Sequence, residues 1–433
     1  MLLEEAGIPS VAVHTDVFAG VARATADANG MSRARQAFVP QPVVDLSRQE
    51  LRGYIEGSDP VSGRPFMREV LDALTGPLDA EDLTGLSFER STPRLLPADT
   101  EDHLQQLFIQ NHWTDYLPVT LPTEARVDAM LKGTSHAPDE IVGRMRPTSF
   151  REFWEYTVEK VAVNAVMAGA RPEYFPVILA LAASQSTAKS SSTTSMTNMA
   201  VVNGPIRHGI GMNCGIGALG PYNHVNVTIG RAYSLLSQNL QGGSVPGETY
   251  MGTLGNGLAY SACFAENEER SPWEPLHVQK GFKPTDSAVS VFFGLRYVQE
   301  GYGPRETWQE KMRRCLSAGA HFPPLLVMDP IVARLFVERS MDTKQKLIDW
   351  CATNALLPAR EYWDDQWVQT LLRPLAVAGV EPYASRLKAE PDAIVQMFEP
   401  KEINIAVSGG GAQGAWKMFG ARYECTISID TWR

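Results

Sequence analysis

The sequence predicts an α/β protein with a partial, Rossmann-like parallel sheet at its N-terminus and a larger α/β or α+β domain after it. Three observations support this. Strand and helix patterns alternate between residues 8 and 39, a chain of 433 residues exceeds what one hydrophobic core normally fills, and residues 93–99 have the composition of a linker. We therefore expect two domains, over residues 1–95 and 100–433.

The N-terminal domain begins with the pattern of a helix end followed by a buried strand. Gly7 is placed to end a helix, and Ile8–Val13 is apolar enough for a buried strand. Asp16 can cap a helix over Val17–Asn29, and Ala37–Val39 predicts the next strand. Because the alternation starts on the tail of a helix, we expect the preceding strand and loop to be missing, which leaves an exposed sheet edge.

The rest of the chain alternates longer helical patterns with short apolar stretches. A helix start is expected at Asp45–Glu50, and helices are expected at Arg64–Leu74, Thr100–His112, Pro122–Gly133, Phe150–Ala170, Gly230–Leu240, Pro330–Asn354 and Trp363–Ala378. No internal repeat is visible. The Ser- and Thr-rich segment Ser184–Thr197 predicts a mobile loop.

Composition narrows the class of protein. The hydrophobic and charged fractions, 44% and 20%, are ordinary for a folded chain, and the net charge of -10 argues against a broad nucleic-acid or anionic-membrane surface. The N-terminus lacks a signal-peptide pattern, so we expect a cytoplasmic protein with no membrane segment. Five scattered cysteines without a CxxC pair favour reduced thiols over disulfides or structural zinc.

The densest group of candidate site residues lies in a glycine-rich stretch over residues 203–231. Closely spaced glycines let the backbone approach a ligand, and the stretch leads into a helix whose N-terminus favours an anion. A thiolate at Cys214 is one hypothesis, since Arg207, His208 and His224 are near in sequence; a buried, inert cysteine is the alternative. The substrate-binding candidates here are Asn203, Gly204, Arg207, Asn213, Gly215 and Gly217.

Two further segments carry candidate catalytic groups. An apolar stretch leads to Glu266 and Glu268, which suit acid–base chemistry or a hard cation, although clustered acids on a loop are often just a solvated face. Asn267, between them, is a further substrate-binding candidate. The apolar helix pattern around Lys160 carries polar groups that need partners, either catalytic or purely structural.

The C-terminal stretch 403–416 carries a GxGxxG pattern. The chain ends too soon after it for a dinucleotide-binding unit, and no GxSxG serine follows for a lipase-type site. We expect Gly410 and Gly411 to complete the substrate pocket formed by residues 203–231, 262–274 and 408–414. The remaining histidines show no metal-binding spacing, so no metal ligands are assigned, and no cofactor can be named.

Residues 7–42 carry a family resemblance. The segments Gly7–Val13, Phe18–Ala24 and Phe38–Pro42 resemble the UGSC family, which is named for a selenocysteine- or cysteine-Gly-Ser-Cys motif. Family members carry that motif one strand and one helix upstream of this point, and here it is missing. Gln41 stands where the family tends to show a histidine.

The second domain resembles an uncharacterised domain that accompanies that family. The similar segments are Trp113–Pro118, Val158–Gly169, Arg171–Tyr174, Val202–Ile206, Ala265–Glu269, Ser271–Pro275 and Gly409–Gly411. If the reactive sulfur or selenium belongs at the missing strand-to-helix turn, the resemblance implies a separate small subunit that carries this strand and the Sec/Cys motif. That subunit would also cover the open sheet edge.

These observations predict a subunit of a hetero-oligomeric, thiol- or selenol-dependent enzyme that acts on a small anionic molecule. The expected chemistry is transfer, elimination or reduction at carbon–sulfur or related bonds. One alternative is a metal-assisted lyase or hydrolase that uses Glu266, Glu268 and His224. Another is a non-catalytic binding or scaffold subunit.

Overall fold

The computed structural model describes residues 8–28, 34–43, 46–77, 93–144, 155–188, 196–241, 254–257, 263–301, 307–319, 322–411 and 414–433. The expected helix end at Gly7, part of the predicted Ser184–Thr197 loop and part of the glycine-rich tail lie outside these residues.

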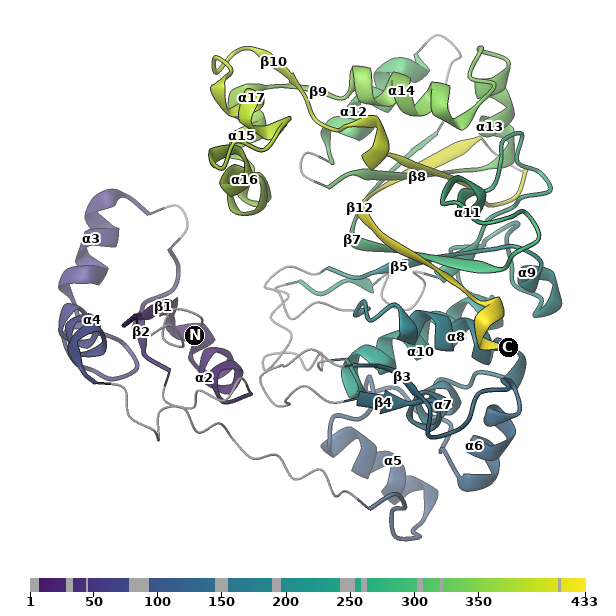
Figure 1. Ribbon diagram of the computed structural model, residues 1–433, viewed down its shortest axis with the longest axis horizontal. Coiled ribbons are helices and arrows are strands. Elements are labelled where there is room, and N and C mark those ends of the chain that lie inside the picture. The colour runs from purple at the N-terminus through teal and green to yellow at the C-terminus, as the bar shows by residue number, and fades with distance from the viewer. Residues whose placement is uncertain are drawn as a thin grey trace.

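The N-terminal unit contains a two-stranded parallel sheet. Strands β1 (Ala12–Thr15) and β2 (Gln36–Val39) pair in register from Ala12 with Gln36 to Thr15 with Val39, and α2 (Ala19–Ala28) connects them. Helices α3 (Arg48–Glu56) and α4 (Phe66–Thr75) follow, grouped with the strands in Figure 1. The predicted Rossmann-like βαβ unit is therefore confirmed, although its first strand starts at Ala12 rather than at Ile8.

The larger body is built on a curled, mixed six-stranded sheet with the order β11-β8-β12-β7-β5-β6. Its centre is the antiparallel pair of long strands β7 (Ala288–Gly301) and β12 (Ala415–Ser428). Strands β5 (Met199–Asn203) and β6 (Cys263–Ala265) extend the sheet beyond β7. Strands β8 (Pro324–Met328) and β11 (Asn404–Val407) extend it beyond β12.

The two halves of this sheet repeat one topology. In each half two parallel strands, joined through helices, are followed by a long strand that runs antiparallel to its neighbour: β5, β6 and β7 in the first half, β8, β11 and β12 in the second. The sequence shows no matching repeat. The duplication therefore lies in the order of the strands and not in their residues.

Helices cover the outer face of each half (Figure 1). Helices α7 (Val158–Met167), α8 (Phe175–Ala183) and α10 (His224–Asn239) pack on the first half, and α12 (Trp308–Ser317), α13 (Pro330–Val337) and α14 (Lys344–Asn354) pack on the second. The concave face holds a third core that includes Phe264, Phe292, Phe419 and Leu276 of the short helix α11 (Leu276–Gln279).

The remaining elements lie around these layers. They are α5 (Glu101–Gln110), α6 (Glu124–Leu131), the hairpin of β3 (Ile141–Arg144) and β4 (Glu155–Thr157), the short α9 (Ile206–Gly209), and a C-terminal group with β9 (Leu356–Pro358), α15 (Ala359–Asp364), α16 (Arg373–Val377), α17 (Tyr383–Lys388) and β10 (Ile394–Gln396). No helix of the described chain is long and apolar enough to cross a membrane.

Several predicted helix boundaries were wrong, three of them by a clear margin. Residues 155–157 were expected to be helical, but they form β4 because they pair with β3. The single helix expected over Pro330–Asn354 is broken between α13 and α14, and the Thr343 hydroxyl restarts it by accepting from Lys346 N. Helix α10 starts at His224, six residues before the expected Gly230.

Candidate functional site

The carboxyl ends of β5, β6 and β11 meet at one buried carboxylate. Glu266 follows β6, and its oxygens accept hydrogen bonds from Asn203 Nδ2 at 2.7 Å, Leu276 N at 2.6 Å, Lys344 Nζ at 3.0 Å and Val407 N at 3.2 Å. The side chains of Glu266 and Lys344 are both fully buried. Glu266 therefore ties four segments together, with its charge balanced inside the protein.

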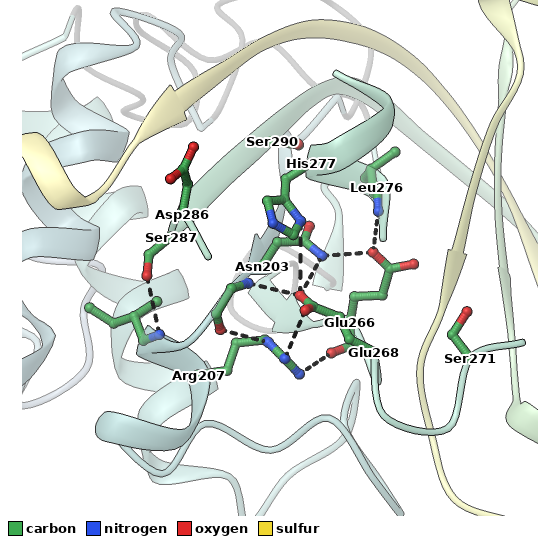
Figure 2. Close-up of polar contacts among 12 residues, drawn as sticks. Asn203, Arg207, Glu266, Glu268, Ser271, Leu276, His277, Asp286, Ser287 and Ser290 are labelled. Atoms are coloured by element: carbon green, nitrogen blue, oxygen red, sulfur yellow. Dashed lines mark hydrogen bonds and ion pairs between the residues drawn. The ribbon is translucent and has the colours of Figure 1, made fainter. Parts of the chain in front are cut away.

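Glu268 shares the donor Asn203 with Glu266, and we call the connected hydrogen bonds of these two residues the carboxylate network (Figure 2). It accepts hydrogen bonds from Asn203 Nδ2 at 2.9 Å and Gly204 N at 2.8 Å, and it pairs with Arg207 at 3.0 Å. Arg207 is almost fully buried and also donates to the Glu266 carbonyl at 2.7 Å. Gly204 has a φ of +85°, and a Cβ there would lie 2.0 Å from the Asp286 carbonyl oxygen, so only glycine fits.

The network reaches the surface at Glu269. Its carboxylate accepts from Arg207 at 2.9 Å and contacts His208 Nε2 at 2.8 Å. The Arg207 hydrogen bond, with help from His208, lowers the pKa of Glu269 to about 2. The carboxylate is therefore charged across the physiological pH range.

His277 and Lys344 also belong to this network, and neither was predicted from the sequence. His277 is fully buried, and its Nε2 lies 3.1 Å from the Lys283 carbonyl, so this nitrogen carries a proton. Its Nδ1 points toward Glu268 at 4.0 Å and makes no hydrogen bond within the described part of the chain. Lys344 lies far from Glu266 and Glu268 in sequence, and His277 shows no metal-binding spacing. No local pattern therefore indicated either residue.

Cys214 and the glycine-rich tail lie side by side. Gly409 N donates to the Cys214 carbonyl at 2.8 Å, and Asn267 Nδ2 donates to the Gly409 carbonyl at 3.2 Å. A Cβ on Gly410 would lie 2.0 Å from Ile216 Cγ1. Of the segments 203–231, 262–274 and 408–414, which were expected to form one pocket, the described residues around Cys214, Asn267 and Gly409 are in contact here.

The electrostatic environment of Cys214 does not favour the thiolate form of its side chain. Partial burial raises the pKa of the Cys214 thiol, and the nearby Arg207 guanidinium opposes this only in part. Because its pKa is raised, the Cys214 thiol is protonated near neutral pH.

Three asparagines hold the glycine-rich loop that follows Cys214. Asn213 accepts from Gly215 N at 2.7 Å and donates to Asn223 Oδ1 at 2.6 Å. Asn223 donates in turn to the Gly217 carbonyl at 2.6 Å, and the buried Asn226 accepts from Asn213 N at 3.0 Å. Asn213, Gly215 and Gly217 therefore shape the loop together with Asn223 and Asn226, which were not predicted from the sequence.

A pocket of about 460 Å³ opens at the N-terminus of α10, and we call it the α10 pocket. Its lining residues are Arg171, Tyr174, Ile210, Gly211, Asn213, Tyr222, Asn223, His224, Val225 and Asn226. None of these is acidic. The Asn223 side chain binds loop carbonyls and does not cap α10, so the first turn presents uncapped N–H groups at the pocket wall.

Two predicted catalytic residues lie apart from the carboxylate network. His224 lines the α10 pocket, where its Nδ1 lies 3.3 Å from the Tyr174 hydroxyl. Lys160 lies exposed in the first turn of α7, where its N–H binds the Thr157 hydroxyl. The structure therefore divides the predicted catalytic residues among three places.

The carboxylates are poorly arranged for a cation. Within the described chain, no three or more His, Cys, Asp and Glu side chains are grouped to hold a metal ion. The oxygens of Glu266 and Glu268 already accept from amide, guanidinium and ammonium groups. A metal centre built on Glu266, Glu268 and His224 finds no support in this geometry.

Comparison with known proteins bears on the N-terminal unit. The model of the UGSC family matches residues 1–58. No curated protein and no solved structure matches the chain significantly. The resemblance seen in β1, α2 and β2 is therefore confirmed, and the N-terminal 58 residues are similar to the UGSC family.

Proposed function

We propose that this chain is the anion-binding subunit of a hetero-oligomeric, thiol- or selenol-dependent enzyme that acts on a small molecule. The observation that carries the proposal is the α10 pocket. It combines Arg171, for which no ion pair is found in the described chain, with His224 and the uncapped first turn of a 16-residue helix. Positive partial charge at the helix N-terminus and a guanidinium both favour a carboxylate, sulfonate or phosphate group.

The reactive group is proposed to come from another polypeptide. The raised pKa of Cys214 weakens it as a nucleophile, which favours a thiol or selenol supplied from outside. Strand β1 pairs with β2 in a two-stranded parallel sheet, and its other edge has no strand partner among the described residues. A strand added beside β1 would complete the sheet, and the turn after that strand would place a Sec/Cys-Gly-Ser-Cys motif at a helix N-terminus.

Calorimetric titration with acetate, malonate and inorganic phosphate tests the pocket. We expect binding of at least one of these anions, and Arg171→Gln should weaken it about tenfold because one charge-assisted contact is lost. Arg314→Gln, at an exposed arginine on α12, is the matched control and should bind like wild type. Equal loss in both variants, or no binding to wild type, contradicts the anion site.

Copurification tests the second polypeptide. The tagged chain, isolated from its own cells, should retain a small protein with a Sec/Cys-Gly-Ser-Cys turn between a strand and a helix. A purified chain that is monomeric and turns over substrate unaided would refute the two-chain enzyme. A complex whose activity survives Arg171→Gln and Cys214→Ala would instead favour a scaffold role.

A further inference from the structure

The α10 pocket is larger than a small anion needs. Its volume of about 460 Å³ lies in the range of cavities that hold small organic molecules. Arg171 and the first turn of α10 account for one charged group of a ligand, as the proposed function requires. The remaining volume suits an uncharged part of the same ligand, and the rest of the lining decides which chemistry that part has.

The asparagine amides of the lining are already used by the glycine-rich loop. Asn213, Asn223 and Asn226 each make two hydrogen bonds through Nδ2, to acceptors within residues 213–223, so both N–H groups of each amide are taken. Each amide oxygen also accepts a hydrogen bond, at 2.6–3.0 Å. These three side chains therefore offer no free donor to the uncharged part of a ligand.

The other lining side chains are aromatic or aliphatic. Tyr174 and His224 lie with their ring centroids 5.9 Å apart, and the Tyr174 hydroxyl lies 3.3 Å from His224 Nδ1. Ile210 and Val225 add branched aliphatic groups, and Tyr222 adds a third ring. Carbon surfaces, and ring faces above all, are thus what the lining offers beyond its positive part.

Tyr222 is a fully exposed ring on a fixed loop. Its backbone has a φ of +68°, a conformation that bulky residues rarely adopt and keep only where the surroundings fix it. The next residue supplies that restraint, because Asn223 donates to the carbonyls of Gly217 at 2.6 Å and Gly220 at 3.0 Å. A flat ligand that covers the Tyr222 ring would remove apolar surface from water at little cost in ordering the loop.

We propose that the ligand of the α10 pocket is an aromatic carboxylate. Its carboxylate group binds Arg171 and the first turn of α10, and its ring packs on Tyr222. Two aromatic rings attract each other beyond the area that they bury, which an aliphatic ring of the same size does not reproduce. Tyr222 is therefore a specificity-determining residue of the pocket.

Calorimetric titration of the full-length chain with acetate, benzoate and cyclohexanecarboxylate tests this proposal. Each anion carries one carboxylate, so the three differ only in the uncharged part. We expect benzoate to bind about tenfold more tightly than acetate and about threefold more tightly than cyclohexanecarboxylate. The proposal is overturned by equal affinities for acetate and benzoate, or by cyclohexanecarboxylate binding at least as tightly as benzoate.

Variants at Tyr222 test the residue itself. Tyr222→Ala should weaken benzoate binding about fivefold and leave acetate binding unchanged, whereas Tyr222→Phe keeps the ring and should bind both like wild type. Tyr116→Ala is the matched control, since Tyr116 is also exposed, has a φ of +64° and does not line the pocket. Unchanged benzoate affinity in Tyr222→Ala, or an equal loss in Tyr116→Ala, overturns the assignment of Tyr222.

The aromatic ligand and the anion site fail in different ways. Acetate binding that depends on Arg171, without any advantage for benzoate, leaves the anion-binding subunit intact and overturns only the aromatic ligand. If none of the three anions binds, or if Arg171→Gln binds all of them like wild type, both proposals are overturned.

Discussion

Glu266 stabilises the fold because four donors surround it, from β5, α11, α14 and β11. A fully buried ion pair such as Glu266–Lys344 adds little net stability compared with an apolar pair of the same shape. Removing one partner, in contrast, leaves an isolated charge in the interior.

Glu266→Gln should therefore lower the free energy of unfolding by about 3–5 kcal/mol, because the Lys344 ammonium loses its counter-charge. Urea denaturation measures the change. The exposed Glu274→Gln is the control, with an expected change within about 0.5 kcal/mol. The double variant Glu266→Gln, Lys344→Met should recover part of the loss, because it removes the unpaired ammonium while the amide that replaces the Glu266 carboxylate still accepts a hydrogen bond through its carbonyl oxygen. Full stability in Glu266→Gln would contradict the structural role.

Cys214 should react slowly with iodoacetamide at pH 7. The raised pKa of its thiol leaves less thiolate than in a free cysteine, and the alkylation rate should climb only as the pH approaches that higher pKa. Peptide mass spectrometry at a series of pH values measures the rate. Alkylation faster than that of free cysteine at pH 7 would restore Cys214 as a nucleophile.

Residue types and their clustering predicted much of the candidate site. Asn203, Gly204, Arg207, Glu266 and Glu268 were expected from local density, and they do come together. Their partners Lys344 and His277 could not be expected. They reach the site only through the folding of α14 and α11, and no spacing in the chain encodes that approach.

At the scale of elements, helix starts with a capping residue were the most predictable. The Ser47–Glu50 capping box begins α3, and Thr100 caps α5, as their residue types indicate. The strand β4 was not predictable, because its pairing with β3 is a non-local interaction that overrides the helical pattern of residues 150–170. Local chemistry thus specifies where elements begin better than which element forms.

The C-terminal turn is held by a pH-sensitive contact. His136 contacts the Thr431 carbonyl at 2.6 Å and Glu140 at 2.8 Å, and these two partners raise its pKa above the usual value. The ring also lies 4.7 Å from that of Trp432. A raised pKa in the folded state means that the stabilisation is complete below about pH 6.5 and is lost as the pH rises through the folded value.

Hydrogen exchange of the amides of residues 430–433 should therefore speed up as the pH rises above about 6.5, beyond the intrinsic increase. His136→Gln should remove this additional pH dependence. His103→Gln, at an exposed histidine beside Asp99, should leave it intact. A profile in His136→Gln that matches wild type would assign the effect to another group.

At the scale of the whole molecule, the four hydrophobic clusters lie between Phe108 and Ile429. A fragment spanning residues 93–433 should therefore fold alone, which would support the predicted division into two domains. Its thermal unfolding should be cooperative, with a melting temperature close to that of the corresponding transition in the full chain. An insoluble or non-cooperative fragment would show that the N-terminal unit contributes to the core.

The two sheets of this chain treat their edges differently. In the larger sheet, Asn267 N donates to the Val407 carbonyl at 2.7 Å, so the two outermost strands join where they end. The β1–β2 pair has no comparable junction among the described residues, and Ile8, Val13 and Val17 are exposed beside it. Unpaired backbone groups of an edge strand next to exposed apolar side chains can pair with a strand of another copy of the chain. Self-association during overproduction should therefore begin at this small N-terminal sheet and not at the six-stranded sheet.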